Sequence, residues 1–208
     1  VIVMHDSNAY RTTGVDENIA NMTYKEVRRL DAGSWYSDEY KGEKVPGLRE
    51  VLELAQGKIK LNIELKPADN GEELARKTVA LIEKYNMEND CVITSFSSSA
   101  LSAAKSCDEN IRVGYILSAA YGDYYDMKNI DFFSVNAAFL SKRTIDAIHN
   151  SGKQVYAWTV NNKDSIKNLT NKGVDGVITD NPVLARETIY SRDTSETIVN
   201  MIRYVFNQ

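Results

Sequence analysis

Leu61-Asn62-Ile63-Glu64-Leu65-Lys66-Pro67 reads as an apolar strand that carries a carboxylate and an ammonium two residues apart near its end. Side chains of a strand alternate between its faces, so Asn62, Glu64 and Lys66 share one side. Polar groups on an otherwise buried strand are costly to desolvate unless something pairs with them. A metal ion on Glu64 with an anion on Lys66 would supply that pairing, and so would a structural Glu–Lys ion pair. Pro67 then stops the strand.

Further along the chain, apolar runs alternate with segments of helical periodicity. The predicted strands are 61–66, 91–96, 112–117, 131–136, 154–160 and 176–180. The predicted helices between and after them are 71–87, 97–105, 141–152, 162–173, one that starts at Pro182, and an amphipathic helix over 198–206. Repeated strand–helix units of this kind give a parallel sheet, which is either doubly wound or closed into a barrel.

The residues at the strand ends favour the barrel. No glycine-rich dinucleotide or phosphate-loop fingerprint follows any of the strands, which counts against a doubly wound sheet. Polar residues instead recur at the carboxyl ends, for example Ser95, Asn136, Thr159 and Asp180. In (β/α)8 barrels that end of the strands carries the function. The sequence therefore predicts an α/β fold of the barrel type, with six strands where a complete barrel has eight.

The segment before residue 61 has a different character. Val1–Asp6 is predicted to be a strand that ends in His5-Asp6, and Arg11-Thr12-Thr13-Gly14 then turns the chain. Residues 15–47 are long and irregular, with one short helix capped by Thr23. A loop of this length that holds its own small elements is usually functional, often as a lid over a site. A helix over 48–55 leads into the Glu64 strand.

Composition limits the classes of protein that fit. A chain of 208 residues with 43% hydrophobic content can form one globular domain with a sizeable core. The net charge of −4 and the lack of a basic block point to neither nucleic acid nor an anionic membrane surface as a partner. Cys91 and Cys107 have no metal or redox spacing, and we expect buried apolar thiols. The chain opens mid-strand without a Met, so we expect a piece of something longer.

The motifs, taken in order, resemble the glycerophosphodiester phosphodiesterase family. Each motif is weak alone, but their order and spacing over nearly all of the chain make the resemblance specific. They are His5-Asp6, Arg11-Thr12-Thr13, Leu30-Asp31-Ala32-Gly33, residues 42–52, Asn62-Ile63-Glu64-Leu65-Lys66, Ser95-Phe96, Ala157-Trp158-Thr159-Val160-Asn161, and residues 173–182. One departure is Gly47, where the family usually has Thr.

The resemblance implies a (β/α)8 TIM barrel that hydrolyses glycerophosphodiesters to an alcohol and glycerol phosphate. It implies a divalent cation, Ca²⁺ or Mg²⁺, held by three carboxylates, and two histidines acting as general acid and base. His5 matches one of those histidines, and Glu64 matches one of the metal carboxylates. Lys66 would bind the phosphate as a second positive centre.

Two aromatic residues are candidates for the substrate pocket. Trp158 lies where the family places an aromatic against the glycerol or alcohol portion, although a tryptophan taken alone is more often part of a core. Phe96 is expected to line the same pocket. His149, in contrast, is expected to be a solvated residue on a helix.

Part of the family pattern is absent from the sequence. The first two strands of the family, with His-Arg-Gly and Glu-x-Asp, would lie upstream of Val1, and they supply one histidine and two metal carboxylates. We therefore expect residues 1–208 to form a single domain with a lid over 15–47, to be inactive alone, and to self-associate over the open edge of the barrel. The expected partner is a small phosphodiester. The alternative is a non-catalytic module that binds a phosphorylated ligand.

Overall fold

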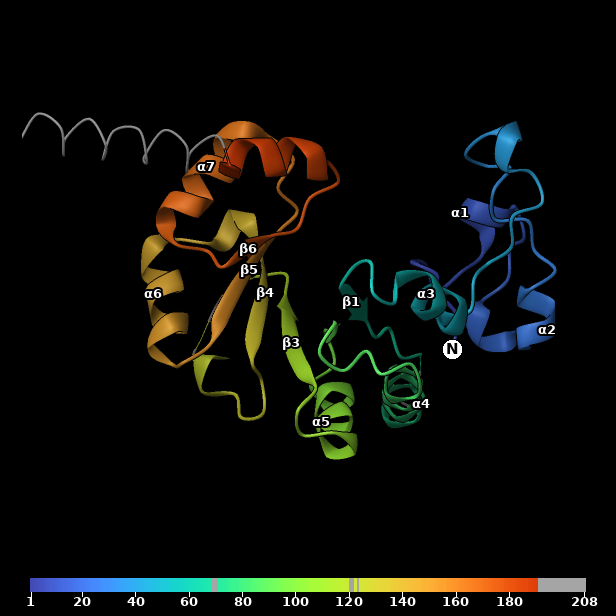
Figure 1. Cartoon of the computed structure of the whole chain (residues 1–208), viewed down its shortest axis with the longest axis horizontal. Coiled ribbons are helices and arrows are strands. Elements are labelled where there is room, and N and C mark those ends of the chain that lie inside the picture. Colours follow the sequence, from blue (N-terminus) through green and yellow to red (C-terminus); the bar gives the residue numbers. More distant parts are fainter. Residues whose placement is uncertain (69–70, 120–121, 123, 191–208) are drawn as a thin grey trace, which may run out of the picture. The chain divides into compact units, whose positions relative to one another are not determined.

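The computed structural model describes residues 1–68, 71–119, 122 and 124–190 (Figure 1). It divides into two compact units, Val1–Arg112 and a second unit that starts at Val113. In the described residues, no helix is both long enough and apolar enough to cross a membrane.

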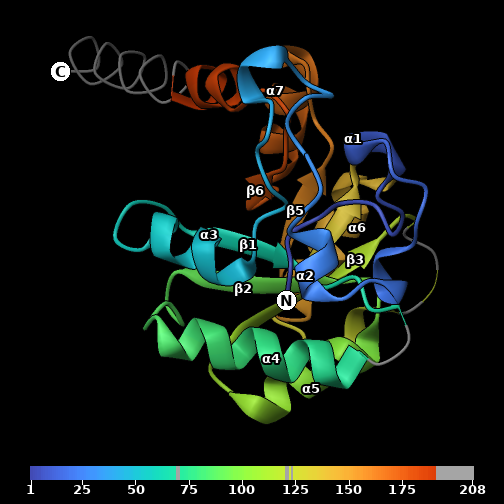
Figure 2. The same ribbon diagram turned by 90° about the vertical axis from the view of Figure 1, so that its right-hand side faces the viewer.

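The first unit contains two parallel strands and three longer helices. Strand β1 (Leu61–Glu64) pairs with β2 (Cys91–Ser95), with Leu61 opposite Cys91 and Glu64 opposite Thr94. Helix α4 (Gly71–Lys84) packs along α5 (Ser98–Cys107), and the pair lies on one side of the two strands (Figure 2). The core of this unit is formed by aliphatic side chains of these elements and of α3 (Leu48–Ala55), among them Leu52, Val79, Ile82, Ile93 and Leu101.

The residues before α3 form a chain of short elements, namely α1 (Tyr10–Thr13), η1 (Ile19–Asn21), α2 (Tyr24–Val27) and η2 (Asp38–Tyr40). The predicted helix at Thr23 is confirmed, and Thr23 and Glu26 form a capping box around α2. The predicted strand Val1–Asp6 is wrong. Ile2 forms only an isolated antiparallel bridge with Gly47, since Val3 N–H donates to the Pro46 carbonyl but the chain then bends away.

The second unit is a parallel sheet of four strands in chain order. These are β3 (Arg112–Leu117), β4 (Phe132–Asn136), β5 (Gln154–Trp158) and β6 (Gly176–Val177). Short turns η3 (Tyr124–Asp126) and η4 (Ala137–Phe139) flank β4. Helices α6 (Lys142–Asn150) and α7 (Lys163–Lys172) connect the later strands, and residues 182–190 are helical (Figure 1). Phe132 and Phe133 are fully buried in this sheet.

Predicted helix ends agree closely with the structure because local hydrogen bonds set them. Ser97, Ser141 and Asn162 each accept a backbone N–H from the first turn of α5, α6 and α7. Gly173 ends α7 with a φ of 93°, a left-handed conformation that glycine adopts at little cost. The predicted helix over 198–206 lies outside the described residues.

Strand β1 ends at Glu64 where the sequence predicted a strand over 61–66, and two strands of the second unit also end earlier than predicted. β5 ends at Trp158 and β6 at Val177, where the sequence predicted strands over 154–160 and 176–180. Pairing nevertheless continues beyond them. Ile178 N–H donates to the Ala157 carbonyl at 2.8 Å, and Val160 N–H donates to the Ile178 carbonyl at 2.9 Å. Backbone hydrogen bonds therefore hold the polar residues after β5 and β6 near each other, although these residues are not in regular strands.

Candidate active site

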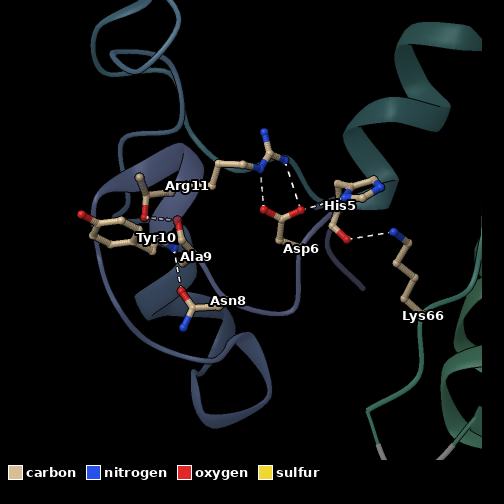
Figure 3. Close-up of polar contacts among 8 residues, drawn as sticks. His5, Asp6, Asn8, Ala9, Tyr10, Arg11 and Lys66 are labelled. Atoms are coloured by element: carbon tan, nitrogen blue, oxygen red, sulfur yellow. Dashed lines mark hydrogen bonds and ion pairs between the residues drawn. The ribbon is translucent and has the colours of Figure 1, made fainter. Parts of the chain in front are cut away.

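His5 lies in the first unit, in the irregular chain before α1. Its Nδ1 is 2.7 Å from Asp6 Oδ1, and 76% of its side chain is exposed (Figure 3). Within the described residues, its Nε2 has no hydrogen-bond partner. An exposed imidazole with one nitrogen held by a carboxylate and the other open is suited to move a proton.

Arg11 holds the same carboxylate from the other side. Its Nε donates to Asp6 Oδ2 at 2.5 Å and its Nη2 to Asp6 Oδ1 at 3.2 Å, which is the bidentate geometry that guanidinium favours (Figure 3). The hydrogen bond from Arg11, followed by the one from His5, lowers the pKa of Asp6 to about 2. Asp6 is therefore an anion at neutral pH, with both of its oxygens occupied.

The one-turn helix α1 sets the position of Arg11. Asn8 Oδ1 accepts the Tyr10 N–H at 2.8 Å, and Gly14 ends the turn with a φ of 75°, a conformation that favours glycine. The predicted turn at 11–14 is thus a short helix with a glycine stop. The Arg11 side chain extends from this helix toward Asp6 (Figure 3).

Lys66 connects the end of β1 to His5. Its Nζ donates to the His5 carbonyl at 2.9 Å (Figure 3). The same Nζ lies 3.8 Å from Glu64 Oε2. The structure therefore brings Glu64, Lys66 and His5 together, with Lys66 as the link. At 3.8 Å the Glu64–Lys66 ion pair is loose, and both side chains are about one third exposed.

The expected burial of this strand face is wrong. Asn62, Glu64 and Lys66 do alternate with aliphatic residues as predicted, but all three are exposed, and Leu61 and Ile63 are only half-buried. The reason is that β1 pairs with β2 alone among the described residues, so its outer edge has no neighbouring strand. Thr94 donates a hydrogen bond to Asn62 Oδ1 at 2.9 Å across that pair.

An open groove of about 1160 Å³ contains this cluster. His5, Asp6, Glu64 and Lys66 lie at its polar part. Aliphatic residues form much of the rest, including Val1, Val3, Leu48, Leu61 and Ile63. A groove of this composition has room for a phosphodiester headgroup beside an apolar wall.

The two aromatic candidates lie elsewhere. Phe96 follows β2 in the first unit and is half exposed, but it does not line the groove. Trp158 ends β5 in the second unit, and its indole N–H donates to the Ser134 carbonyl at 3.0 Å. Its half-buried ring is therefore oriented by a backbone contact. Roles for both in substrate binding stay predictions.

The described residues do not by themselves form a complete metal centre. No group of three or more His, Cys, Asp or Glu side chains in them is arranged to hold a metal ion. Glu64 is one exposed carboxylate, and its nearest charged neighbour is an ammonium. Calcium and magnesium usually need several oxygen ligands.

Asp31 organises the expected lid. Its carboxylate accepts hydrogen bonds from Gly33 N–H, Ser34 N–H, Ser34 Oγ and Gly42 N–H at 2.7 to 3.0 Å. These bonds, the one from the Ser34 backbone first, hold the pKa of Asp31 well below its usual range. Trp35 follows this turn, and the Arg11 guanidinium lies 5.7 Å from its ring centre. One residue of the segment expected to be a lid, Trp35, therefore lies against the residue that holds Asp6.

Sequence reasoning did not assign site roles to Asp6 and Arg11. The signal was present, because the two residues flank His5 in recognisable motifs. A motif does not show, however, that one carboxylate contacts both the His5 ring and the Arg11 guanidinium. His149 was expected to be only a solvated helix residue, but its Nε2 lies 2.8 Å from Asp175 Oδ2. Cys91 is buried as expected, whereas Cys107 is exposed, and both are free.

Comparison with solved structures supports the fold. A phosphodiesterase from Oleispira antarctica, solved with the product sn-glycerol-3-phosphate, matches with a TM-score of 0.79 at 29% identity, over 90% of this chain and 78% of that one. A glycerophosphodiester phosphodiesterase from Parabacteroides distasonis matches with a TM-score of 0.80 at 21% identity, over 92% of this chain and 79% of that one. The fold class is thus the (β/α)8 TIM barrel, and the described residues contain six of its strands, as predicted.

Sequence comparison gives the family. The model of the glycerophosphoryl diester phosphodiesterase family matches residues 1–184. A glycerophosphodiester phosphodiesterase from Caldanaerobacter subterraneus is 27% identical over 98% of this chain and 80% of its own length. One from Bacillus subtilis is 28% identical over 88% of this chain and 70% of its own length. The chain belongs to the glycerophosphoryl diester phosphodiesterase family. Its members hydrolyse glycerophosphodiesters and generally depend on a divalent metal.

Proposed function

We propose that this chain carries one of the acid–base groups and part of the anion-binding site of an enzyme that hydrolyses glycerophosphodiesters to an alcohol and glycerol phosphate. The observation that carries the proposal is the contact between two sequence-distant parts of the family pattern, the His5-Asp6 motif and the strand that holds Glu64 and Lys66. His5 is held by Asp6, and Lys66 links His5 to Glu64. Each of these residues also lines the open groove of the first unit.

The chemistry follows from the leaving group. Hydrolysis places the hydroxide of water on phosphorus, breaks the bond between phosphorus and the alcohol oxygen, and gives a proton to that oxygen. An alkoxide is a poor leaving group, so a positioned acid lowers the barrier. His5 presents Nε2 for such a transfer. Lys66 supplies positive charge at the same end of the groove, where it would stabilise the phosphate oxygens in the transition state.

Glu64 is proposed as one ligand of the divalent cation, Ca²⁺ or Mg²⁺, on which the family generally depends. It is a hard oxygen donor at the carboxyl end of β1, adjacent to the proposed phosphate position. Its partners as ligands would have to come from outside the described residues. For this reason we propose that residues 1–208 alone have little or no hydrolytic activity.

The decisive experiment compares residues 1–208 with a protein extended upstream by two strand–helix units. Both are assayed with glycerophosphocholine and glycerophosphoethanolamine at saturating Ca²⁺ or Mg²⁺, and released glycerol phosphate is measured. We expect turnover in the extended protein that is lost in His5→Ala, with His149→Ala as the matched control. Absence of turnover in the extended protein on every glycerophosphodiester tried would refute the proposed function. Equal turnover in both proteins would refute the inactivity of residues 1–208.

A second candidate is a module that binds a phosphorylated ligand without hydrolysis. Within the part of the chain that the structure describes, Glu64 is the carboxylate paired with Lys66 and no full metal site is formed, which favours an anion site without a metal. Titration calorimetry with sn-glycerol-3-phosphate separates the two candidates. Binding that depends on Lys66, together with no turnover in the extended protein, would favour the module.

A further inference from the structure

The two histidines of this chain are held by carboxylates through opposite ring nitrogens. His5 faces Asp6 Oδ1 with Nδ1 at 2.7 Å, whereas His149 faces Asp175 Oδ2 with Nε2 at 2.8 Å. A carboxylate accepts hydrogen bonds, so the nitrogen that faces it carries the proton in the neutral ring. The neutral form of His5 is then protonated at Nδ1 and that of His149 at Nε2. His149 is therefore an internal reference for the tautomer of His5.

We propose that Asp6 and Arg11 are positioning residues, which hold His5 with its proton on Nδ1 so that Nε2 is the nitrogen that exchanges protons with substrate. The catalytic part of this inference rests on the proposed function. The orientation of the ring does not, because it follows from the contacts alone. A carboxylate that orients a histidine in this way acts through the histidine and touches no substrate.

Asp6 is suited to this role because its own position is fixed. An exposed carboxylate beside a histidine is ordinarily free to rotate away, since an isolated surface pair contributes little. Here Arg11 occupies Oδ2 and shares Oδ1, so rotation of the carboxylate would break two further hydrogen bonds. The pKa of about 2 also keeps Asp6 an acceptor across the neutral range.

Arg11 is in turn restrained by the lid. Its guanidinium lies 5.7 Å from the ring centre of Trp35, and the Trp35 indole N–H donates to the Ala32 carbonyl at 2.9 Å. The turn that holds Trp35 is organised by Asp31. The order of contacts is thus lid, Arg11, Asp6, His5. The His5 ring is therefore positioned by groups that precede the one-turn helix α1 in the sequence and by groups that follow it.

The first test reads the tautomer directly and needs no enzymatic activity. Protein labelled with ¹⁵N-histidine gives two imidazole spin systems, and His149→Gln assigns them. Spectra are recorded near about pH 8.5, where imidazole side chains are ordinarily neutral. We expect His5 to be protonated at Nδ1 and His149 at Nε2. Asp6→Asn should remove the Nδ1 preference of His5, because an amide can donate as well as accept, and leave His149 unchanged.

Arg11→Gln is the second variant. It keeps Asp6 but releases its Oδ2, so the Nδ1 preference of His5 should fall partly. Asp175→Asn is the matched control, which should alter the tautomer of His149 and not that of His5. A wild-type His5 protonated at Nε2 would overturn the inference, and so would a His5 spectrum that Asp6→Asn does not change.

The second test measures turnover in the extended protein. We expect Asp6→Asn to lower kcat by about 10- to 100-fold with little change in KM, a part of the 100- to 10,000-fold that positioned proton transfer contributes. If His5→Ala abolishes turnover but Asp6→Asn leaves kcat intact, the positioning role is refuted while the proposed function stands. If the tautomers behave as expected in a protein without hydrolytic activity, the orientation by Asp6 is supported and the proposed function fails.

Discussion

At the scale of single residues, the carboxylates of the site differ in how fully neighbouring side chains satisfy them. Asp6 illustrates this, because both of its oxygens are used and its pKa is lowered to about 2. Glu64 differs from it. The ammonium of Lys66 is 3.8 Å from the Glu64 carboxylate, so the negative charge of Glu64 is available to a ligand. Available charge of this kind in a groove is typical of binding sites, whereas a tight structural pair would be satisfied internally.

Glu64→Gln tests the proposed ligand. The substitution keeps the volume and removes the charge that a hard cation needs, so activity in the extended protein should fall by orders of magnitude at any Ca²⁺ or Mg²⁺ concentration. Stability should change by less than about 1 kcal/mol, because the Glu64–Lys66 pair is exposed. Turnover is measured across a metal titration, with Glu83→Gln in α4 as the control. Normal metal dependence in Glu64→Gln would exclude Glu64 as a ligand.

His5→Ala and Trp158→Ala separate chemistry from binding. A group that transfers a proton acts in the transition state, so His5→Ala should lower kcat by about 100-fold or more and leave KM nearly unchanged. A ring that stacks on the alcohol portion acts in ground and transition states alike, so Trp158→Ala should chiefly raise KM. Steady-state kinetics of the extended protein measure both. Two variants that raise KM alone would contradict the assigned roles.

At the scale of elements, local hydrogen bonds determine how firmly each segment is held. In the proposed lid over residues 15–47, the turn that follows Asp31 (the lid turn) depends on one carboxylate, which receives four hydrogen bonds from residues 33, 34 and 42. The β3–β4 pair depends on a different feature, the absence of a side chain at Gly114. A Cβ there would lie 2.1 Å from Phe132 Cε2.

The lid turn should respond to pH in a direction set by Asp31. Its pKa is lower in the folded protein than in the unfolded chain, so it stabilises the turn above the unfolded pKa of about 4 and loses that effect as pH falls through the folded pKa. Hydrogen exchange of the Gly33, Ser34 and Gly42 amides should accelerate, relative to intrinsic rates, below about pH 4. Asp31→Asn should reduce protection at neutral pH and flatten this response. Unchanged protection in Asp31→Asn would contradict the assignment.

Gly114→Ala should destabilise the second unit. Phe132 is fully buried, so its ring has no free space into which to move, and overpacking of this kind typically costs about 1–3 kcal/mol. Urea denaturation measures the loss. Phe132→Leu in the same chain should recover part of it, because the shorter side chain removes the clash. A Gly114→Ala protein within about 0.5 kcal/mol of wild type would show that the sheet can separate to accommodate the methyl group.

At the scale of the whole molecule, the outer edge of β1 is a surface that proteins normally cover. Among the described residues, β1 pairs only with β2, and its half-buried Leu61 and Ile63 line the open groove. Free strand edges and apolar grooves favour association. Family relatives are longer than this chain, which covers 80% of the Caldanaerobacter protein and 70% of the Bacillus one.

Residues 1–208 should therefore self-associate through this edge. The weight-average mass in sedimentation velocity should rise with protein concentration, because each copy gains backbone and apolar contacts at β1. Ile63→Lys should suppress the rise by placing a charge in the groove. Val183→Lys, on an exposed site of the second unit, is the control and should have no effect. A monomer at every concentration would refute the prediction.

The sequence by itself determined the family and most of the helices and strands. Caps such as Ser97, Ser141 and Asn162 act over two or three residues, so their helices begin where the sequence predicts. Alternation in β1 and the order of six strands likewise need only local information. The motifs around His5, Glu64 and Trp158 were enough to indicate glycerophosphodiester hydrolysis.

Only the tertiary structure decided which of these groups meet and how much water reaches them. Lys66 binds the carbonyl of a residue 61 positions away, and no local pattern encodes that contact. Asn62 and Glu64 were expected to be buried but are exposed, because burial of a strand face depends on whether another strand lies beside it. Val1–Asp6 has strand-like residues but forms a single bridge, since a strand also requires a partner over several residues. Local hydrogen bonds are determined by neighbouring residues, whereas burial and long-range contacts are determined by what packs alongside.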